Sequence, residues 1–172
     1  MHEQSEISRF EQTILPHLDA AYNLARWLLR NESDAEDVVQ EAYLRAFKFF
    51  GGFHGDNGRA WLLKIIRNTC YTWLQHNRAH ELAIEFDEQL HSGESDNPES
   101  IVLENINTQL LKHALEELPP EFREAVILRE LEGLSYKEIA AIADVPVGTV
   151  MSRLGRARKR LQHCLTDHKR EF

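Results

Sequence analysis

Residues 134–161, LSYKEIAAIADVPVGTVMSRLGRARKRL, decide how the fold is interpreted. This stretch predicts a short helix opened by a Ser135–Glu138 capping box, a tight turn at 144–147 and a second helix from Val147 to about Cys164. The apolar side chains of the second helix recur on one face, at Val150, Leu154, Ala157 and Leu161. A short helix, a tight turn and a second helix are the spacing of a helix-turn-helix, whose second helix enters the major groove of DNA.

The remaining faces of that second helix carry five Arg or Lys residues and no acid between positions 148 and 163. Candidate ligands for duplex DNA share a cationic or hydroxyl side chain: Thr149, Ser152, Arg153, Arg156, Arg158, Lys159 and Arg160. An Arg side chain can bind a guanine bidentately or bind a phosphate, so we expect base contacts from Arg153 and Arg156 and phosphate contacts from Arg158 and Arg160. The alternative is a solvated basic face, because runs of charge are common on protein surfaces.

The rest of the chain also predicts helices, which makes the fold class all-α. The spacing of apolar and capping residues predicts helices at 7–14, 16–30, 33–50, 59–77, 98–117 and 119–133. Pro16 suits the first turn of the second of these helices, and a Ser33–Glu36 capping box opens the third. We therefore predict two small helical domains, at 1–78 and 98–172, with the helix-turn-helix in the second.

The segment between the two predicted domains, residues 79–97, is strongly acidic. The 172 residues carry a net charge of −8, and eight acids with no Lys or Arg lie between positions 81 and 104. Removing those eight charges leaves the rest of the chain neutral. Weak periodicity and polar composition predict an acidic flexible linker, although a long surface loop within one domain would have the same composition. With no obvious means of self-inhibition, the two domains are expected to move relative to each other.

Two further helices have outward faces that indicate binding. The outward stripe of the 59–77 helix mixes cations, amides and one aromatic, which suits single-stranded DNA as well as an ordinary amphipathic surface: Lys64, Arg67, Asn68, Tyr71, Gln75 and Arg78. The 33–50 helix carries an exposed Leu bracketed by charged and amide groups, which suits a protein partner: Asp37, Gln40, Glu41, Leu44 and Lys48.

Four segments in order resemble the extracytoplasmic-function (ECF) sigma factors, which are compact two-domain members of the bacterial RNA polymerase sigma family. They are DAEDVVQEAYLRAF at 34–47, WLLKIIRN at 61–68, LPPEFREAVILR at 118–129 and PVGTVMSRLGRAR at 146–158. The resemblance implies that the 34–47 helix binds the clamp helices of core RNA polymerase. It also implies that residues 53–78 melt and read the −10 element, with Asn57 and Arg59 near a flipped base, and that the last helix reads the −35 element as duplex.

The same resemblance implies promoter-specific transcription initiation in a stress response, under the control of an anti-sigma factor. One departure concerns Thr72, where the family often has an acid, so the fine −10 specificity does not carry over.

Other function classes find little support. There is no Gly-rich phosphate loop, GxSxG or HExxH, so we expect neither an enzyme nor a small-molecule substrate. We expect no cofactor and no metal site; His163, Cys164 and His168 share a helix face but lie near the chain end. No apolar run approaches the roughly 18 residues of a membrane span, so a cytoplasmic protein is expected. A stand-alone helix-turn-helix repressor would explain residues 135–160 but not the other surfaces.

Overall fold

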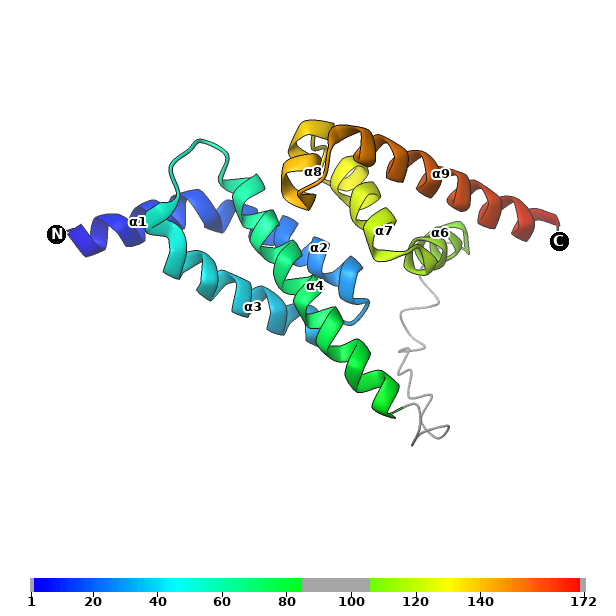
Figure 1. The fold of residues 1–172 in the computed structure, drawn as a ribbon, viewed down its shortest axis with the longest axis horizontal. Helices are drawn as coiled ribbons and strands as arrows, with labels where there is room; N and C mark the ends of the chain where they lie inside the picture. Colours follow the sequence, from blue (N-terminus) through cyan, green and yellow to red (C-terminus); the bar gives the residue numbers. More distant parts are fainter. Residues whose placement is uncertain (1, 85–105, 171–172) are drawn as a thin grey trace.

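The computed structural model describes the backbone of residues 2–84 and 106–170 and the side chains of residues 2–77 and 106–167. Within those ranges the regular elements are all helical and none is a strand, which confirms the all-α prediction. The helices form two groups, α1 to α4 and α6 to α9, and the two groups lie side by side (Figure 1).

The first group contains four helices and two 3-10 turns. They are α1 (His2–Ile14), η1 (Leu15–His17), α2 (Leu18–Leu29), α3 (Glu32–Phe49), η2 (Phe50–Gly52) and α4 (Gly58–Ile84). Phe10 of α1 anchors this group, because its ring meets the rings of Tyr43, Phe47 and Phe50, each with centroids 5.2 Å apart. Gly58 has to be a glycine, since a Cβ there would lie 2.9 Å from the carbonyl oxygen of Thr13.

Two predicted helix starts differ from the structure. Pro16 lies in the 3-10 turn η1 rather than in the first turn of α2. The cap of α3 is Asn31 and not Ser33: the Asn31 side chain accepts a hydrogen bond from the backbone N–H of Asp34. Asn is as good a cap as Ser, and the left-handed backbone of Arg30 turns the chain so that α3 starts earlier.

Helix α4 continues past its expected end at residue 77 and reaches Ile84. The first six residues of the predicted linker are therefore helical. Residues 85–105 lie outside the described part of the chain, so most of the predicted linker and the expected helix start near Pro98 lie outside it as well.

The second group forms the helix-turn-helix. Its elements are α6 (Ile106–Glu117), α7 (Pro120–Val126), the wider π-type turn η3 (Ile127–Leu131), α8 (Tyr136–Ala143) and α9 (Val147–Arg170). Both hydrogen bonds of the predicted Ser135–Glu138 capping box are present. Gly133, with φ of 67°, and Asp144, with φ of 56°, take left-handed conformations that reverse the chain before and after α8.

Each group buries the apolar stripe that its periodicity predicts. In α9, Val150, Leu154 and Ala157 are at most 1% exposed, and in α4, Leu62 and Ile66 are fully buried. Leu63 is also fully buried, and it lies about 100° around α4 from Leu62. A helix that buries more than one side has a second packing partner.

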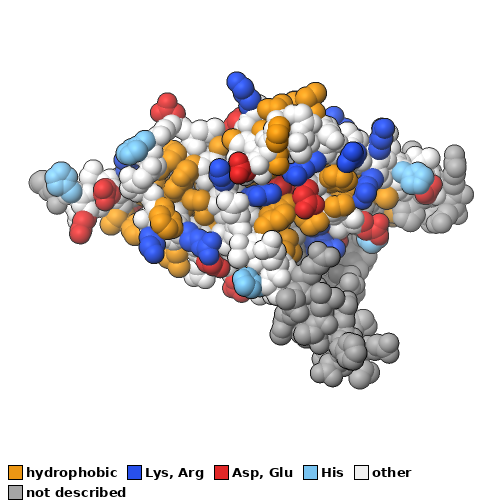
Figure 2. Space-filling view, viewed as in Figure 1, with side chains coloured by type: hydrophobic (Ala, Val, Ile, Leu, Met, Phe, Trp, Pro, Cys, Tyr) orange, Lys and Arg blue, Asp and Glu red, His pale blue; other side chains and the backbone are white. Residues whose placement is uncertain are grey.

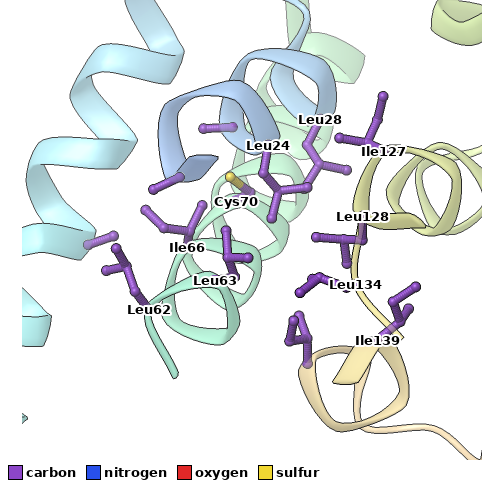
Figure 3. Packing of buried hydrophobic residues seen from close by; sticks show 14 of the residues in the cluster. Leu24, Leu28, Leu62, Leu63, Ile66, Cys70, Ile127, Leu128, Leu134 and Ile139 are labelled. Atoms are coloured by element: carbon purple, nitrogen blue, oxygen red, sulfur yellow. The ribbon is translucent and has the colours of Figure 1, made fainter. Parts of the chain in front are cut away.

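The second partner of α4 is the other helix group. Helix α4 packs against α8, and α2 packs against α7. Leu28 and Leu63 of the first group face Ile127, Leu128 and Leu134 of the second across this contact, and all five belong to one buried cluster (Figure 3). The two groups are therefore packed against each other through one shared apolar cluster.

Candidate polymerase and nucleic-acid interfaces

The basic face of α9 lies on the outside of the molecule. Lys and Arg side chains gather along this helix in the space-filling view (Figure 2). Most of the candidate −35 residues are exposed, and only Thr149 and Arg153 are half-buried. The exposed members are Ser152, Arg156, Arg158, Lys159 and Arg160.

The arginines of this face have different surroundings. Arg158 donates a 3.0 Å hydrogen bond to Glu130, and Arg160 lies 5.1 Å above the ring of Phe122. Arg156 makes no hydrogen bond or ion pair with the described residues. Arg156 is therefore the arginine whose guanidinium is most available to a base edge.

The outward face of α3 is uncovered along its whole length. All five candidate polymerase-binding residues are exposed, with Leu44 62% exposed: Asp37, Gln40, Glu41, Leu44 and Lys48. Glu41 forms an ion pair of 2.9 Å with Arg45 one turn along the helix. Sequence reasoning missed two exposed aromatic side chains at the C-terminal end of α3, Phe47 and Phe49, which are 50% and 60% exposed. Their exposure could not be deduced from helical phase, since aromatic residues are usually assigned to the core.

Part of the candidate −10 face of α4 is in contact with the second helix group. The Arg67 Nε atom donates a 2.7 Å hydrogen bond to the Glu124 carboxylate, and the Tyr71 hydroxyl donates one of 3.0 Å to the other oxygen of that carboxylate. The Arg67 guanidinium also stacks 4.1 Å above the Tyr71 ring. Tyr71 was predicted to be an exposed aromatic, and this is wrong, because its side chain is half-buried and its hydroxyl is bound to Glu124 of α7.

Burial shifts the pKa values of the side chains in this cluster. Glu124 is 1% exposed, and desolvation raises the pKa of its carboxyl although Arg67 acts against the rise. Burial alone would lower the pKa of Arg67, but the adjacent Glu124 carboxylate outweighs burial and raises it. The pKa of Tyr71 is raised, first by burial and then by the charge of Glu124. Tyr71 thus stays protonated and remains a hydrogen-bond donor.

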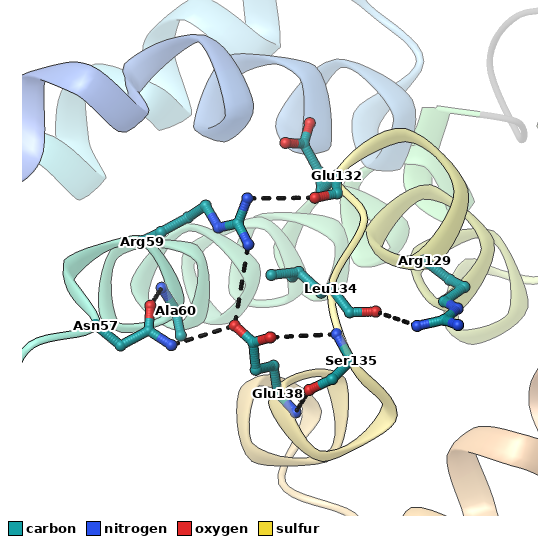
Figure 4. Close-up of polar contacts among 8 residues, drawn as sticks. All are labelled: Asn57, Arg59, Ala60, Arg129, Glu132, Leu134, Ser135 and Glu138. Atoms are coloured by element: carbon teal, nitrogen blue, oxygen red, sulfur yellow. Dashed lines mark hydrogen bonds and ion pairs between the residues drawn. The ribbon is translucent and has the colours of Figure 1, made fainter.

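A second polar cluster joins the start of α4 to α8 (Figure 4). The Asn57 side chain donates a 3.2 Å hydrogen bond to Glu138, and its own oxygen caps the N–H of Ala60. Arg59 donates to the backbone oxygen of Glu132 at 3.3 Å and lies 4.0 Å from the Glu138 carboxylate. Hydrogen bonds from the Ser135 backbone and then from Asn57 lower the pKa of Glu138.

Arg123 of α7 is a buried cation that the sequence did not reveal. It is 3% exposed and donates hydrogen bonds to the backbone oxygens of Trp27 at 2.8 Å, Leu28 at 3.3 Å and Leu118 at 3.0 Å. The first two oxygens lie at the end of α2, where helix carbonyls lack partners. Burial, and then the nearby charge of Arg30, lower the pKa of Arg123 to about 10.

The remaining candidate −10 residues are not covered. Lys64, Asn68 and Gln75 are exposed, and the side chain of Arg78 lies outside the described residues. Thr72, which departs from the family pattern, donates its hydroxyl to the backbone oxygen of Asn68 in its own helix. The structure therefore places four of the eight candidates, Asn57, Arg59, Arg67 and Tyr71, in contact with the second helix group.

The described residues offer neither a metal site nor a membrane span. Among them, no group of three or more His, Cys, Asp or Glu is placed to hold a metal ion. No helix within 2–84 and 106–170 is both long and apolar enough to cross a membrane.

Comparisons with known proteins divide the chain in the same way as its helices. Residues 13–80 match the family model of Sigma-70 region 2, and residues 108–161 match that of Sigma-70, region 4. The ECF RNA polymerase sigma-E factor of Escherichia coli is 40% identical over 139 residues, which cover 76% of this chain and 73% of that protein. The chain belongs to the ECF RNA polymerase sigma factors.

Two further relatives agree with this sigma-factor assignment. The ECF RNA polymerase sigma factor SigE of Mycolicibacterium smegmatis is 35% identical over 170 residues, which cover 98% of this chain and 66% of that relative. The sigma factor RpoE of Bartonella quintana, solved in complex with the anti-sigma factor NepR, aligns with a TM-score of 0.75 and 31% identity. That alignment covers 92% of this chain and 97% of the other, so it includes both helix groups.

Proposed function

We propose that the chain binds core RNA polymerase through the outward face of α3 and recognises promoters through α4 and α9. The single observation that carries the proposal is the match of region 2 and region 4 of the sigma family to the two helix groups that bear these surfaces. The chemistry of the three surfaces supports three different contacts: with a protein partner, with duplex DNA and with melted DNA.

The α3 face is suited to a protein partner. It combines the carboxylates of Asp37 and Glu41 with the apolar side chain of Leu44, and it is free of the second helix group. Phe47 and Phe49, at the end of the same helix, add further exposed apolar surface. Core polymerase would cover these apolar groups, and the acids would select a basic partner surface.

The α9 face is suited to duplex DNA. Its apolar side is buried against its own domain, so the opposite side, with Arg156 and Lys159, is free to enter a major groove. Arg156 would contact a base edge of the −35 element, while Arg158 and Arg160 would contact phosphates.

The α4 face is suited to the melted −10 element. Cations that follow phosphates, an aromatic ring and amides that meet unstacked bases are the groups that single-stranded DNA requires, and Lys64, Arg67, Asn68, Tyr71 and Gln75 supply them. Asn57 and Arg59 lie at the start of the same helix and would contact a flipped base.

An anti-sigma factor is the proposed regulator. The Bartonella quintana sigma factor that this chain resembles was solved in complex with an anti-sigma factor, NepR. An inhibitor that clamps both helix groups would hide the polymerase surface and the promoter surfaces together. Capture of the chain from unstressed cells of its host, followed by mass spectrometry, tests this: recovery of polymerase with no stoichiometric inhibitor would contradict it.

The test of the proposed function is transcription in a purified system. Core RNA polymerase and fragmented genomic DNA of the host are incubated with and without the chain, and the 5′ ends of the transcripts are sequenced. We expect new start sites that share a common upstream sequence and need both proteins. Sequence-specific binding of the chain alone, with no polymerase-dependent start sites, would favour a stand-alone helix-turn-helix repressor instead.

A further inference from the structure

We propose that the second helix group is a plug for the −10 site: Glu124 and Glu138 occupy the α4 side chains that bind single-stranded DNA. The domains then have to separate before the DNA strand can enter. This inference rests on the proposed −10 role of α4. It assigns to α7 and α8 a second role, in addition to building the helix-turn-helix.

The first contact of the plug is made by Glu124. One of its oxygens accepts the 2.7 Å hydrogen bond from Arg67, and the other accepts the 3.0 Å hydrogen bond from Tyr71. A phosphate of a DNA strand would offer the same arrangement of charged acceptor oxygens to the same two donors. With the carboxylate in place, Arg67 is only 17% exposed, so a strand and Glu124 cannot use it together.

The second contact is made by Glu138 at the opposite end of the plug. Its carboxylate binds Asn57 and lies beside Arg59, whose guanidinium also binds the backbone oxygen of Glu132. Glu138 is held in this orientation because its other carboxylate oxygen accepts a hydrogen bond from the backbone N–H of Ser135 in the capping box of α8. The capping box thus stabilises the helix-turn-helix and aims a carboxylate at α4.

The closed state is stabilised by groups that do not bind DNA. Arg123 of α7 donates to the terminal carbonyls of α2, and Leu28 and Leu63 pack across the same boundary. The buried Arg123 guanidinium therefore stabilises contact between the two helix groups, because its hydrogen bonds to the α2 carbonyl oxygens form only when the groups are packed together. A helix end left without such partners would otherwise be satisfied by water.

The proposed plug covers the −10 face only. The outward faces of α3 and α9 remain exposed in the closed state. The chain can therefore meet its protein partner and duplex DNA while Arg67 and Tyr71 are withheld from single-stranded DNA. The experiment accordingly measures the free chain with single-stranded DNA.

The test compares charge reversal at the plug with the same reversal elsewhere. Glu124→Lys sets a cation against Arg67, whereas the matched control Glu117→Lys adds the same charge on an exposed residue of the same helix group. The full-length variants are titrated by fluorescence anisotropy with a labelled pool of random single-stranded 20-mers, and their radius of gyration is measured by small-angle X-ray scattering. Circular dichroism verifies that each variant is folded.

We expect Glu124→Lys to enlarge the radius of gyration and to bind the pool roughly tenfold more tightly than Glu117→Lys, because apparent affinity rises with the open fraction. Adding Arg67→Ala to Glu124→Lys should remove most of that gain. Glu124→Gln keeps a hydrogen-bonding amide without the charge, and it should show a smaller gain in the same direction. It serves as the test if the Lys variant fails to fold.

The results that would overturn the plug differ from those that would overturn the sigma-factor function. Equal radii and equal affinities for Glu124→Lys and Glu117→Lys would overturn it, as would an expanded Glu124→Lys with no gain in binding. In either case polymerase-dependent initiation by the wild type would still stand. A gain in single-stranded binding together with no initiation by any variant would support the plug and refute the promoter role.

Discussion

Helices α3 and α4 belong to the same domain and have similar amphipathic patterns, yet their outward faces have opposite environments. The α3 face is fully exposed, whereas Arg67 and Tyr71 of α4 are bound to a carboxylate of the other domain. The difference follows from charge: α7 and α8 present Glu124 and Glu138, which complement the cations of α4 and would repel the acids of α3. A single closed structure can thus leave one functional surface available and occupy another.

The largest expected effect is on the uncovered face. Changing both Asp37 and Glu41 to Lys should abolish binding to core polymerase, because reversed charges at a complementary interface cost several kcal/mol. Both side chains are exposed, and Glu41 loses only a surface ion pair with Arg45, so the fold should be unchanged. Pull-down measures binding to core polymerase, and circular dichroism measures whether the fold is retained.

The control for that experiment is Glu3→Lys with Glu11→Lys, two exposed acids of α1. This variant has the same net charge, and we expect it to bind polymerase as the wild type does. If the α3 variant were still recovered with polymerase, the binding surface would have to lie elsewhere.

A smaller effect is expected at the covered boundary. Arg123→Met removes the cation that binds three backbone oxygens, and we expect the free energy of unfolding to fall by about 2–3 kcal/mol as buried acceptors lose their partner. Urea unfolding monitored by circular dichroism measures this. Arg45→Met, at an exposed residue, should change it by no more than about 0.5 kcal/mol.

The opposite outcome at Arg123 is also informative. Replacing a buried charge with an apolar residue can stabilise a protein when desolvation outweighs its hydrogen bonds. An Arg123→Met variant as stable as the wild type would therefore show that apolar contacts such as Leu28 and Leu63 hold the closed state by themselves.

Local structure could largely be predicted from the sequence. The capping box at Ser135 and the apolar stripe of α9 are determined by residues close together in the chain, and both are confirmed. The start of α3 was predicted two residues late, because Asn31 and Ser33 are both good caps and only the backbone of Arg30 selects between them.

The arrangement of the two domains could not be predicted in the same way. Helical phase shows which side of α4 is polar, but a polar side can face solvent or another domain. Tyr71 was therefore assigned to the surface, and Glu124 and Arg123 were not recognised as contact residues. The remaining signal was weak: LPPEFREA places Arg123 and Glu124 side by side, directly before the apolar run at 125–128.

Binding of duplex DNA should show an effect of intermediate size. If Arg156 contacts a base, Arg156→Ala should cost roughly 1–3 kcal/mol at one promoter position and relax the preference there. Arg158→Ala should weaken all sequences alike, since its guanidinium is already shared with Glu130. Binding-site selection with each variant distinguishes the two roles, and an unchanged base preference for Arg156→Ala would contradict the assignment.

Arg153 sharpens this prediction, since it is half-buried and its charge acts on Glu124 at the covered boundary. It was expected to match Arg156 as a base contact. If it does so, Arg153→Ala should alter base preference as well. An effect of Arg153→Ala on the radius of gyration alone would assign this residue to the closed state rather than to the −35 element.

The smallest expected effect is on the chemical labelling of the two cysteines. This labelling distinguishes separation of the two domains from loss of structure within the first domain. Cys70 is fully buried, and desolvation, followed by the charge of Glu124, raises the pKa of its thiol to about 12. Cys164 is partly exposed and lines a groove between α6 and α9. The thiolate is the nucleophile, so iodoacetamide at neutral pH should label Cys164 in the native chain and Cys70 only in denaturant.

In Glu124→Lys the labelling pattern should hardly change. Figure 3 shows the Cys70 sulfur beside Leu24 of α2, within the first domain, so separation of the domains does not uncover it. Loss of the Glu124 charge removes only the second cause of the raised pKa and leaves desolvation in place. Mass spectrometry of tryptic peptides follows both sites. Rapid labelling of Cys70 in folded Glu124→Lys would mean that the first domain itself loosens, and the contrast between a free α3 face and a reversibly covered α4 face would then fail.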